Sequence, residues 1–158
     1  TFIGNNRKAE QDFSGSFTNC DPSPACANVC YAARGTAYTS ALIKTEFTEW
    51  MAENHPDALA KKIAGEFENS APGRGGLALR TNEKGDLSEA QLDVIERLNK
   101  IKVDGQNIRI QVFSKRPTLL ARVDDFNLKM LSVDDTNLEI AEQNPELMLS
   151  VMLNDVEV

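Results

Sequence analysis

From residue 76 onward the chain alternates between short apolar runs, polar loops and helix-like segments. Strands are expected at residues 76–80, 108–113, 128–133 and 147–153, and the clearest helix is expected at 89–100. This alternation typically builds a parallel sheet with right-handed crossovers. The strand runs look apolar on both faces, which predicts strands covered on each side. The sequence therefore predicts an α/β fold.

Two parallel architectures fit this alternation: an open doubly wound sheet and a (β/α) barrel. The chain has 158 residues, fewer than a complete eight-stranded TIM barrel needs. Four or five strands fit a partial (β/α) barrel in a single domain, and the start at Thr1 rather than Met favours a piece of a longer chain. Glycines 73, 75 and 76 precede the first clear strand instead of following it, so no dinucleotide site is expected.

The three cysteines of the chain lie within eleven residues, at Cys20, Cys26 and Cys30. An odd number does not form a closed disulfide framework, and this polar, proline-containing loop has no apolar periodicity that would bury three thiols. The C-x5-C-x3-C spacing therefore predicts a metal or cluster site in the loop 20–30. A helical segment, 31–70, and the βα units of 76–158 follow it.

Three thiolates leave one coordination position open. Structural zinc normally has four protein ligands, so a zinc site would need a fourth ligand such as Asp21 or His55, the one histidine of the chain. A [4Fe–4S] cluster held by three cysteines keeps one iron open for a substrate or cofactor. We therefore favour a [4Fe–4S] cluster and keep zinc as the alternative.

Composition narrows the range of partners. The formal net charge is −7, from 24 acidic and 17 basic residues, whereas a general nucleic-acid binder needs concentrated positive charge. No apolar run approaches the length of a membrane span, and no signal-peptide pattern begins the sequence. We expect a cytoplasmic protein that binds neither membranes nor nucleic acids in general. Its substrate, a small molecule or a macromolecule, is not readable from the sequence.

Local signals predict several boundaries. Ser88 is expected to cap the helix that begins at Glu89. Asp104-Gly105 is expected to form a turn, and Pro56 is expected in the first turn of a helix that ends near residue 68. His55 is expected at the surface, at a helix boundary.

The segment CDPSPACANVCYAARGTAY, residues 20–38, resembles the cysteine signature of the phage-associated gene product 88 family. Gly4–Asn6, LRTNEKGDLS at 79–88 and FSKRP at 113–117 resemble further elements of that family. The family is similar to radical S-adenosylmethionine enzymes, which carry a three-cysteine cluster loop after the first strand of a partial (β/α) barrel. Their standard spacing is C-x3-C-x2-C, and both gaps are longer here. The resemblance implies a phage- or mobile-element-encoded iron–sulfur oxidoreductase or transferase that uses S-adenosylmethionine.

In a (β/α) barrel, functional side chains collect where strands end. Gly85 and Asp86 come after the first clear strand, and Ser114, Lys115 and Arg116 come after the second. By the radical-enzyme resemblance, the Gly85-Asp86 turn approaches the amino group of S-adenosylmethionine, and Lys115 or Arg116 meets its carboxylate. Solvated loops and helix caps use the same residue types, so each also has a local explanation.

Arg80 is a further candidate for binding the cofactor. It ends an apolar strand, where an unpaired charge is costly, so we expect a partner or an anionic ligand. The alternative function is a non-catalytic, zinc-stabilised phage accessory or interaction module, whose acidic surface would suit a basic protein partner.

Overall fold

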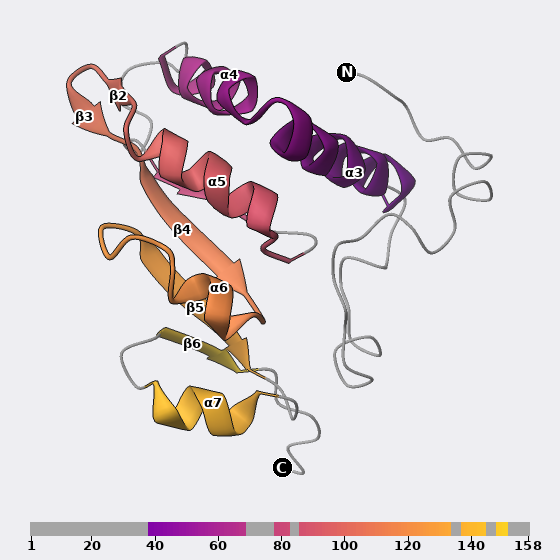
Figure 1. Cartoon of the computed structure of the whole chain (residues 1–158), viewed down its shortest axis with the longest axis vertical. Helices are drawn as coiled ribbons and strands as arrows, with labels where there is room; N and C mark the ends of the chain where they lie inside the picture. Colours follow the sequence, from indigo (N-terminus) through magenta and orange to yellow (C-terminus); the bar gives the residue numbers. More distant parts are fainter. Residues whose placement is uncertain (1–37, 69–77, 83–85, 134–136, 145–147, 152–158) are drawn as a thin grey trace.

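The computed structural model describes residues 38–68, 78–82, 86–133, 137–144 and 148–151 (Figure 1). The cysteine loop at 20–30 lies outside these residues. The helices are α3 (Tyr38–Asn54), α4 (Pro56–Glu68), α5 (Glu89–Leu98), α6 (Pro117–Leu120) and α7 (Leu138–Gln143). The strands are β1 (Ala78–Arg80), β2 (Lys102–Val103), β3 (Gln106–Asn107), β4 (Arg109–Ser114), β5 (Leu128–Val133) and β6 (Met148–Val151).

Four of these strands form one parallel sheet, in the order β1-β4-β5-β6. Its register pairs Leu79 with Ile110, Phe113 with Met130 and Leu131 with Leu149. The expected parallel α/β sheet is therefore confirmed. Neighbouring strands follow one another along the chain, with only the β2–β3 hairpin intervening, and the order does not reverse as it would in a doubly wound sheet. The described strands form an open sheet and not a closed barrel.

The helices that connect these strands follow the sheet from one end to the other (Figure 1). Right-handed crossovers that advance in one direction place their helices on the same face of a parallel sheet. In agreement, α6 contacts both β4 and β5, and α7 contacts β5. Helices α3 and α4 pack against each other and against α5, beside the β1 end of the sheet.

The two faces of the sheet differ in burial. In β4, buried residues at 110, 112 and 114 alternate with more exposed residues at 109, 111 and 113. Ile110 and Val112 belong to the core, whereas Arg109, Gln111 and Phe113 lie on the other face. In the described part of the chain the strands are therefore not buried equally on both faces, because Arg109 and Gln111 interrupt the apolar run on one of them.

The core lies between the sheet and the helices. It combines Leu92, Val94, Ile95 and Leu98 of α5 with buried residues of β4 and β5. The largest side chains that are less than 2% exposed are Leu87, Leu92, Leu98, Val103, Ile108, Ile110, Val112, Leu120, Leu131 and Val133. Burial of these apolar side chains is the main favourable term in folding.

The local signals are confirmed where the structure describes them. The Ser88 hydroxyl accepts a hydrogen bond from the Gln91 N–H at 3.1 Å and so caps α5. Asp104 and Gly105 have φ angles of 50° and 78°, which suit a tight hairpin turn between β2 and β3. The turn was expected, but the two short strands beside it were not. His55 lies exposed between α3 and α4.

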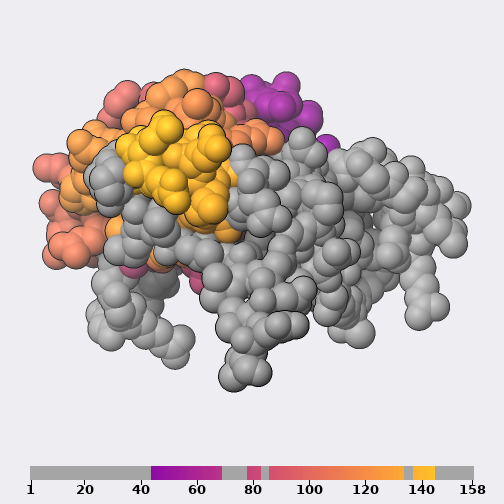
Figure 2. All heavy atoms as spheres, turned by 90° about the horizontal axis from the view of Figure 1, so that it is seen from below, coloured from indigo at the N-terminus to yellow at the C-terminus, as the bar shows by residue number. Residues whose placement is uncertain are grey.

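Several helix residues remain exposed at the surface. Phe47 and Trp50 of α3 are 42% and 48% exposed and stack with their ring centroids 6.1 Å apart. Leu138 and Ile140 of α7 are also exposed, and Figure 2 shows this helix, in yellow, at the surface of the molecule. None of the helices in the described ranges is long and apolar enough to cross a membrane.

Candidate functional site

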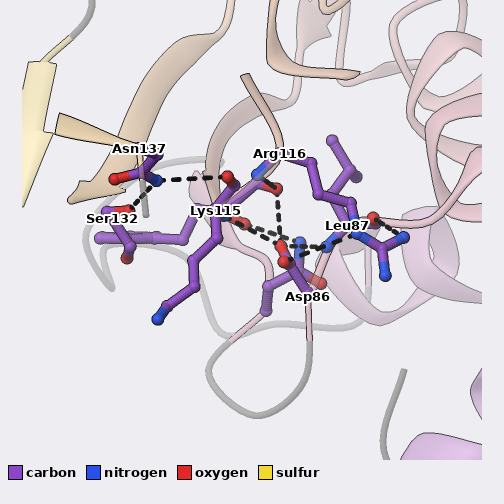
Figure 3. A network of polar contacts seen from close by, with 9 residues as sticks. Asp86, Leu87, Lys115, Arg116, Ser132 and Asn137 are labelled. Atoms are coloured by element: carbon purple, nitrogen blue, oxygen red, sulfur yellow. Dashed lines mark hydrogen bonds and ion pairs between the residues drawn. The ribbon is translucent and has the colours of Figure 1, made fainter. Parts of the chain in front are cut away.

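Polar side chains meet at the carboxyl end of the sheet, where the loops after β1, β4 and β5 lie close together (Figure 3). The loop after β1 contributes Asp86, and the residues at the end of β4 contribute Ser114, Lys115 and Arg116. Asn137, at the start of α7, joins them from the loop after β5. We call these five residues the carboxyl-end network.

Asp86 is the centre of this network and is only 4% exposed. Its Oδ1 accepts hydrogen bonds from the Ser114 hydroxyl at 2.6 Å, from the Leu87 N–H at 2.7 Å and from the Lys115 N–H at 3.1 Å. A buried carboxylate is tolerated when several donors surround it in this way. Asp86 therefore fastens the loop after β1 to the end of β4.

Two neighbouring residues of the loop after β1 hold the Arg116 side chain. Its Nη1 donates to the Leu87 carbonyl at 3.1 Å, and its Nε lies 3.8 Å from Asp86 Oδ2. Its backbone N–H donates to the Ser114 hydroxyl at 2.9 Å. The Arg116 side chain is nevertheless 40% exposed. The protein thus positions the guanidinium, on a side chain that is partly exposed.

Lys115 and Asn137 take part in different ways. The Lys115 side chain extends away from Asp86 in Figure 3, and the Lys115 backbone N–H donates to Asp86. Asn137 Nδ2 donates to the carbonyls of Ser132 at 2.8 Å and Lys115 at 3.3 Å. Asn137 precedes α7, but its side chain does not cap that helix. Instead it joins the end of β5 to the end of β4.

Asn82 makes a similar connection from the end of β1. Its Nδ2 donates to the Phe113 carbonyl on β4 at 2.9 Å. Its φ is 55°, in the left-handed region that asparagine tolerates better than most residues. The residues that follow β1 are therefore tied to β4 by Thr81, Asn82 and Asp86.

Arg80 lies apart from the carboxyl-end network. Its guanidinium carbon is 4.4 Å from the centroid of the Phe113 ring, a cation–π contact between neighbouring strands. Arg80 is exposed, so its charge is not held in the apolar core. We expected a partner or an anionic ligand for the charge of Arg80, and the ring of Phe113 is such a partner.

The remaining predicted site residues are Gly85 and the cysteines Cys20, Cys26 and Cys30, all outside the described residues. Within the described ranges no three histidine, cysteine, aspartate or glutamate side chains gather as a metal site would require. The exposed His55 packs edge-on against Trp50, with the ring centroids 5.1 Å apart.

A pocket of about 400 Å³ opens beside the carboxyl end of β1. Its walls combine apolar side chains of α4, β1 and α5 with polar ones that include Lys44, Thr48 and Asn82. Sequence reasoning missed this pocket because its walls come from four elements. In the sequence, only the apolar stripe of α4 pointed towards this pocket. Two residues of that stripe, Leu59 and Ile63, line the pocket.

Two ion-paired groups away from the carboxyl-end network have shifted pKa values. Asp93 and Asp57 raise the pKa of Arg97 through hydrogen bonds, and Lys129 lowers the pKa of Asp125 in the same way. All of these groups except Lys129 and Arg97 are largely exposed. They stabilise surface contacts and do not mark a reactive centre.

Comparison with known protein families, with curated proteins and with solved structures finds no match for this chain.

Proposed function

We propose that this chain is an iron–sulfur protein of the radical S-adenosylmethionine type, related to the phage-associated gene product 88 family. Cys20, Cys26 and Cys30 would hold a [4Fe–4S] cluster. The observation that carries the proposal is the C-x5-C-x3-C spacing, since three thiolates in one short loop leave one coordination position open. When bound, such a cluster supplies redox chemistry and an iron position for the amino and carboxylate groups of S-adenosylmethionine.

The order of the strands supports this proposal. Parallel strands that neighbour one another in chain order, with helices on one face, are the arrangement of a (β/α) barrel. We therefore interpret the open four-stranded sheet as part of such a barrel. Enzymes with this architecture bind their ligands at the carboxyl ends of the strands.

The carboxyl-end network supplies residues suited to a cofactor. Arg116 is the group we assign to meet a carboxylate, because Asp86 and the Leu87 carbonyl hold its guanidinium and its side chain is 40% exposed. Asp86 acts through Arg116 and the loop after β1, so we assign it a positioning role. Ser114 supports Asp86 by donating its hydroxyl hydrogen.

The test is a metal analysis of the full chain purified without oxygen. The proposal predicts a brown protein with a broad absorbance shoulder and about four irons and four sulfides per chain. Replacing each cysteine in turn by serine should lower the iron content sharply, whereas His55→Ala should leave it unchanged. A colourless protein with one zinc per chain, unfolded by a chelator, would support the zinc-stabilised module instead.

A further inference from the structure

A second pocket lies towards the amino ends of β4 and β5, away from the carboxyl-end network. It has a volume of about 640 Å³ and is lined by the first residues of β4 and β5, Arg109 and Leu128, and by the residues just before β5. Arg80, Gln111, Phe126 and Asn127 also line it. We call it the amino-end pocket.

Two arginines give this pocket a positive character. The register pairs Ala78 with Arg109 and Arg80 with Gln111, which places Arg80 and Arg109 on the same face of the sheet. Both are exposed, and among the described residues the Arg109 guanidinium has no hydrogen-bond or ion-pair partner. In a chain with a net charge of −7, two arginines that line one pocket favour a negatively charged ligand.

The acidic side chain in the lining does not cancel this charge. Asp125 lines the pocket, but its carboxylate is 2.6 Å from the Lys129 ammonium. That ion pair satisfies Asp125 locally and leaves the arginines without a counter-ion from the described lining. The described lining of the pocket therefore carries a net positive charge.

Asn127 is an independent sign of a ligand. It is 5% exposed, and its Oδ1 is buried without a hydrogen-bond partner. The Asn127 Nδ2 donates to Asn99 Oδ1 at 3.1 Å, and this hydrogen bond fixes which end of the amide is the nitrogen. Buried acceptors in folded proteins nearly always have a donor. The oxygen itself has almost no accessible surface. A ligand N–H or O–H would therefore supply the missing donor once the Asn127 side chain turns towards the pocket.

Exposed apolar side chains complete the lining. Phe126 is 48% exposed and Leu128 is 42% exposed, and both border the pocket. Small-molecule sites typically combine apolar walls with a few polar groups that fix the orientation of the ligand. Here the apolar contribution comes from Phe126 and Leu128 and the polar contribution from the arginines and Asn127.

We propose that the amino-end pocket binds a small organic anion. Its phosphate or carboxylate group would meet Arg80 and Arg109, its apolar or planar body would pack on Phe126 and Leu128, and one N–H or O–H would donate to Asn127 Oδ1. This inference goes beyond the proposed function, because the pocket does not involve the cysteines or the carboxyl-end network.

Calorimetric titration of the full chain tests it with two probes, 4-hydroxyphenyl phosphate and 4-hydroxybenzoate, which distinguish a phosphate ligand from a carboxylate ligand. At least one probe should bind saturably, and Arg109→Gln should weaken that binding about tenfold, the usual effect of losing a charged hydrogen bond. Lys61→Gln, which removes an exposed cation from α4, should leave it unchanged. Near-ultraviolet circular dichroism verifies that each variant is folded, and Arg109→Lys should retain part of the affinity.

Phenyl phosphate tests the role of Asn127, because it lacks the hydroxyl donor. It should bind the natural chain several-fold more weakly than 4-hydroxyphenyl phosphate, and Asn127→Ala should remove that difference. Absence of saturable binding by both hydroxylated probes would overturn the proposal. Equal losses in Arg109→Gln and Lys61→Gln would also overturn it, since they would indicate binding to net charge and not to this pocket. Neither result would bear on the cysteine site.

Discussion

The two ends of the parallel strands use their polar side chains in opposite ways. At the carboxyl end, Asp86, Ser114 and Asn137 are buried and hydrogen-bonded to groups on neighbouring loops. At the amino end, Arg109 is exposed and Asn127 keeps a buried oxygen without a donor. Polar residues after a strand can therefore serve first to hold loops in place. Exposed charged groups such as Arg109 are the better sign of a binding site.

The largest effect is expected from Asp86→Ala. Ser114 and two backbone N–H groups would lose their buried acceptor, so the free energy of unfolding should fall by about 3 kcal/mol. Urea unfolding monitored by circular dichroism measures it. The matched control is Asp125→Ala, which removes a carboxylate from a side chain that is 97% exposed. Equal effects of the two substitutions would contradict the structural role of Asp86.

Asn137→Ala should have the next largest effect on stability. It leaves the carbonyls of Ser132 and Lys115 without the Asn137 donor, in a position only 5% exposed. We expect the free energy of unfolding to fall by about 1–2 kcal/mol in the same urea experiment. An unchanged unfolding midpoint would show that Asn137 does not join the ends of β4 and β5 in solution.

Arg116→Gln should separate stability from binding. Because the Arg116 side chain is 40% exposed, the free energy of unfolding should change by less than about 1 kcal/mol. Under the proposed function, S-adenosylmethionine should bind about tenfold more weakly to the reconstituted protein. Equilibrium dialysis measures this affinity, and Lys61→Gln is the control. Equal affinities in the natural chain and Arg116→Gln would remove Arg116 from the cofactor site.

The smallest effect is expected from Asp125→Asn. Lys129 lowers the pKa of Asp125 in the folded chain, so the contribution of this ion pair is present above the unfolded pKa and is lost as the pH falls through the folded pKa. Urea midpoints of the two proteins should differ slightly at neutral pH and converge in acid. A difference that grows on acidification would contradict the sign of this pKa shift.

Much of the fold could be predicted from the sequence, because local periodicity determines it. The expected strand at 128–133 coincides with β5, and Ser88 caps α5 as its position before Glu89 indicated. The β2 and β3 strands were missed because each is two residues long. A pattern of alternation needs more residues than that to be recognised.

The arrangement of the site was less predictable. The sequence singled out Asp86 and Ser114 separately, but their hydrogen bond joins residues 28 positions apart. Such a contact depends on the register of the strands, which a local sequence pattern does not predict. Arg109 and Asn127 were not singled out at all. Arg109 lay within an apparently apolar strand, and the unpaired oxygen of Asn127 becomes visible only once its neighbours are placed.

We propose that the three cysteines hold a cluster with one open iron, and Mössbauer spectroscopy of the iron-57 protein, with and without S-adenosylmethionine, is the direct test. We expect four irons per chain, of which one changes its signal when S-adenosylmethionine is added. Four irons that are all unaffected by S-adenosylmethionine, or a protein that takes up zinc and no iron, would contradict it.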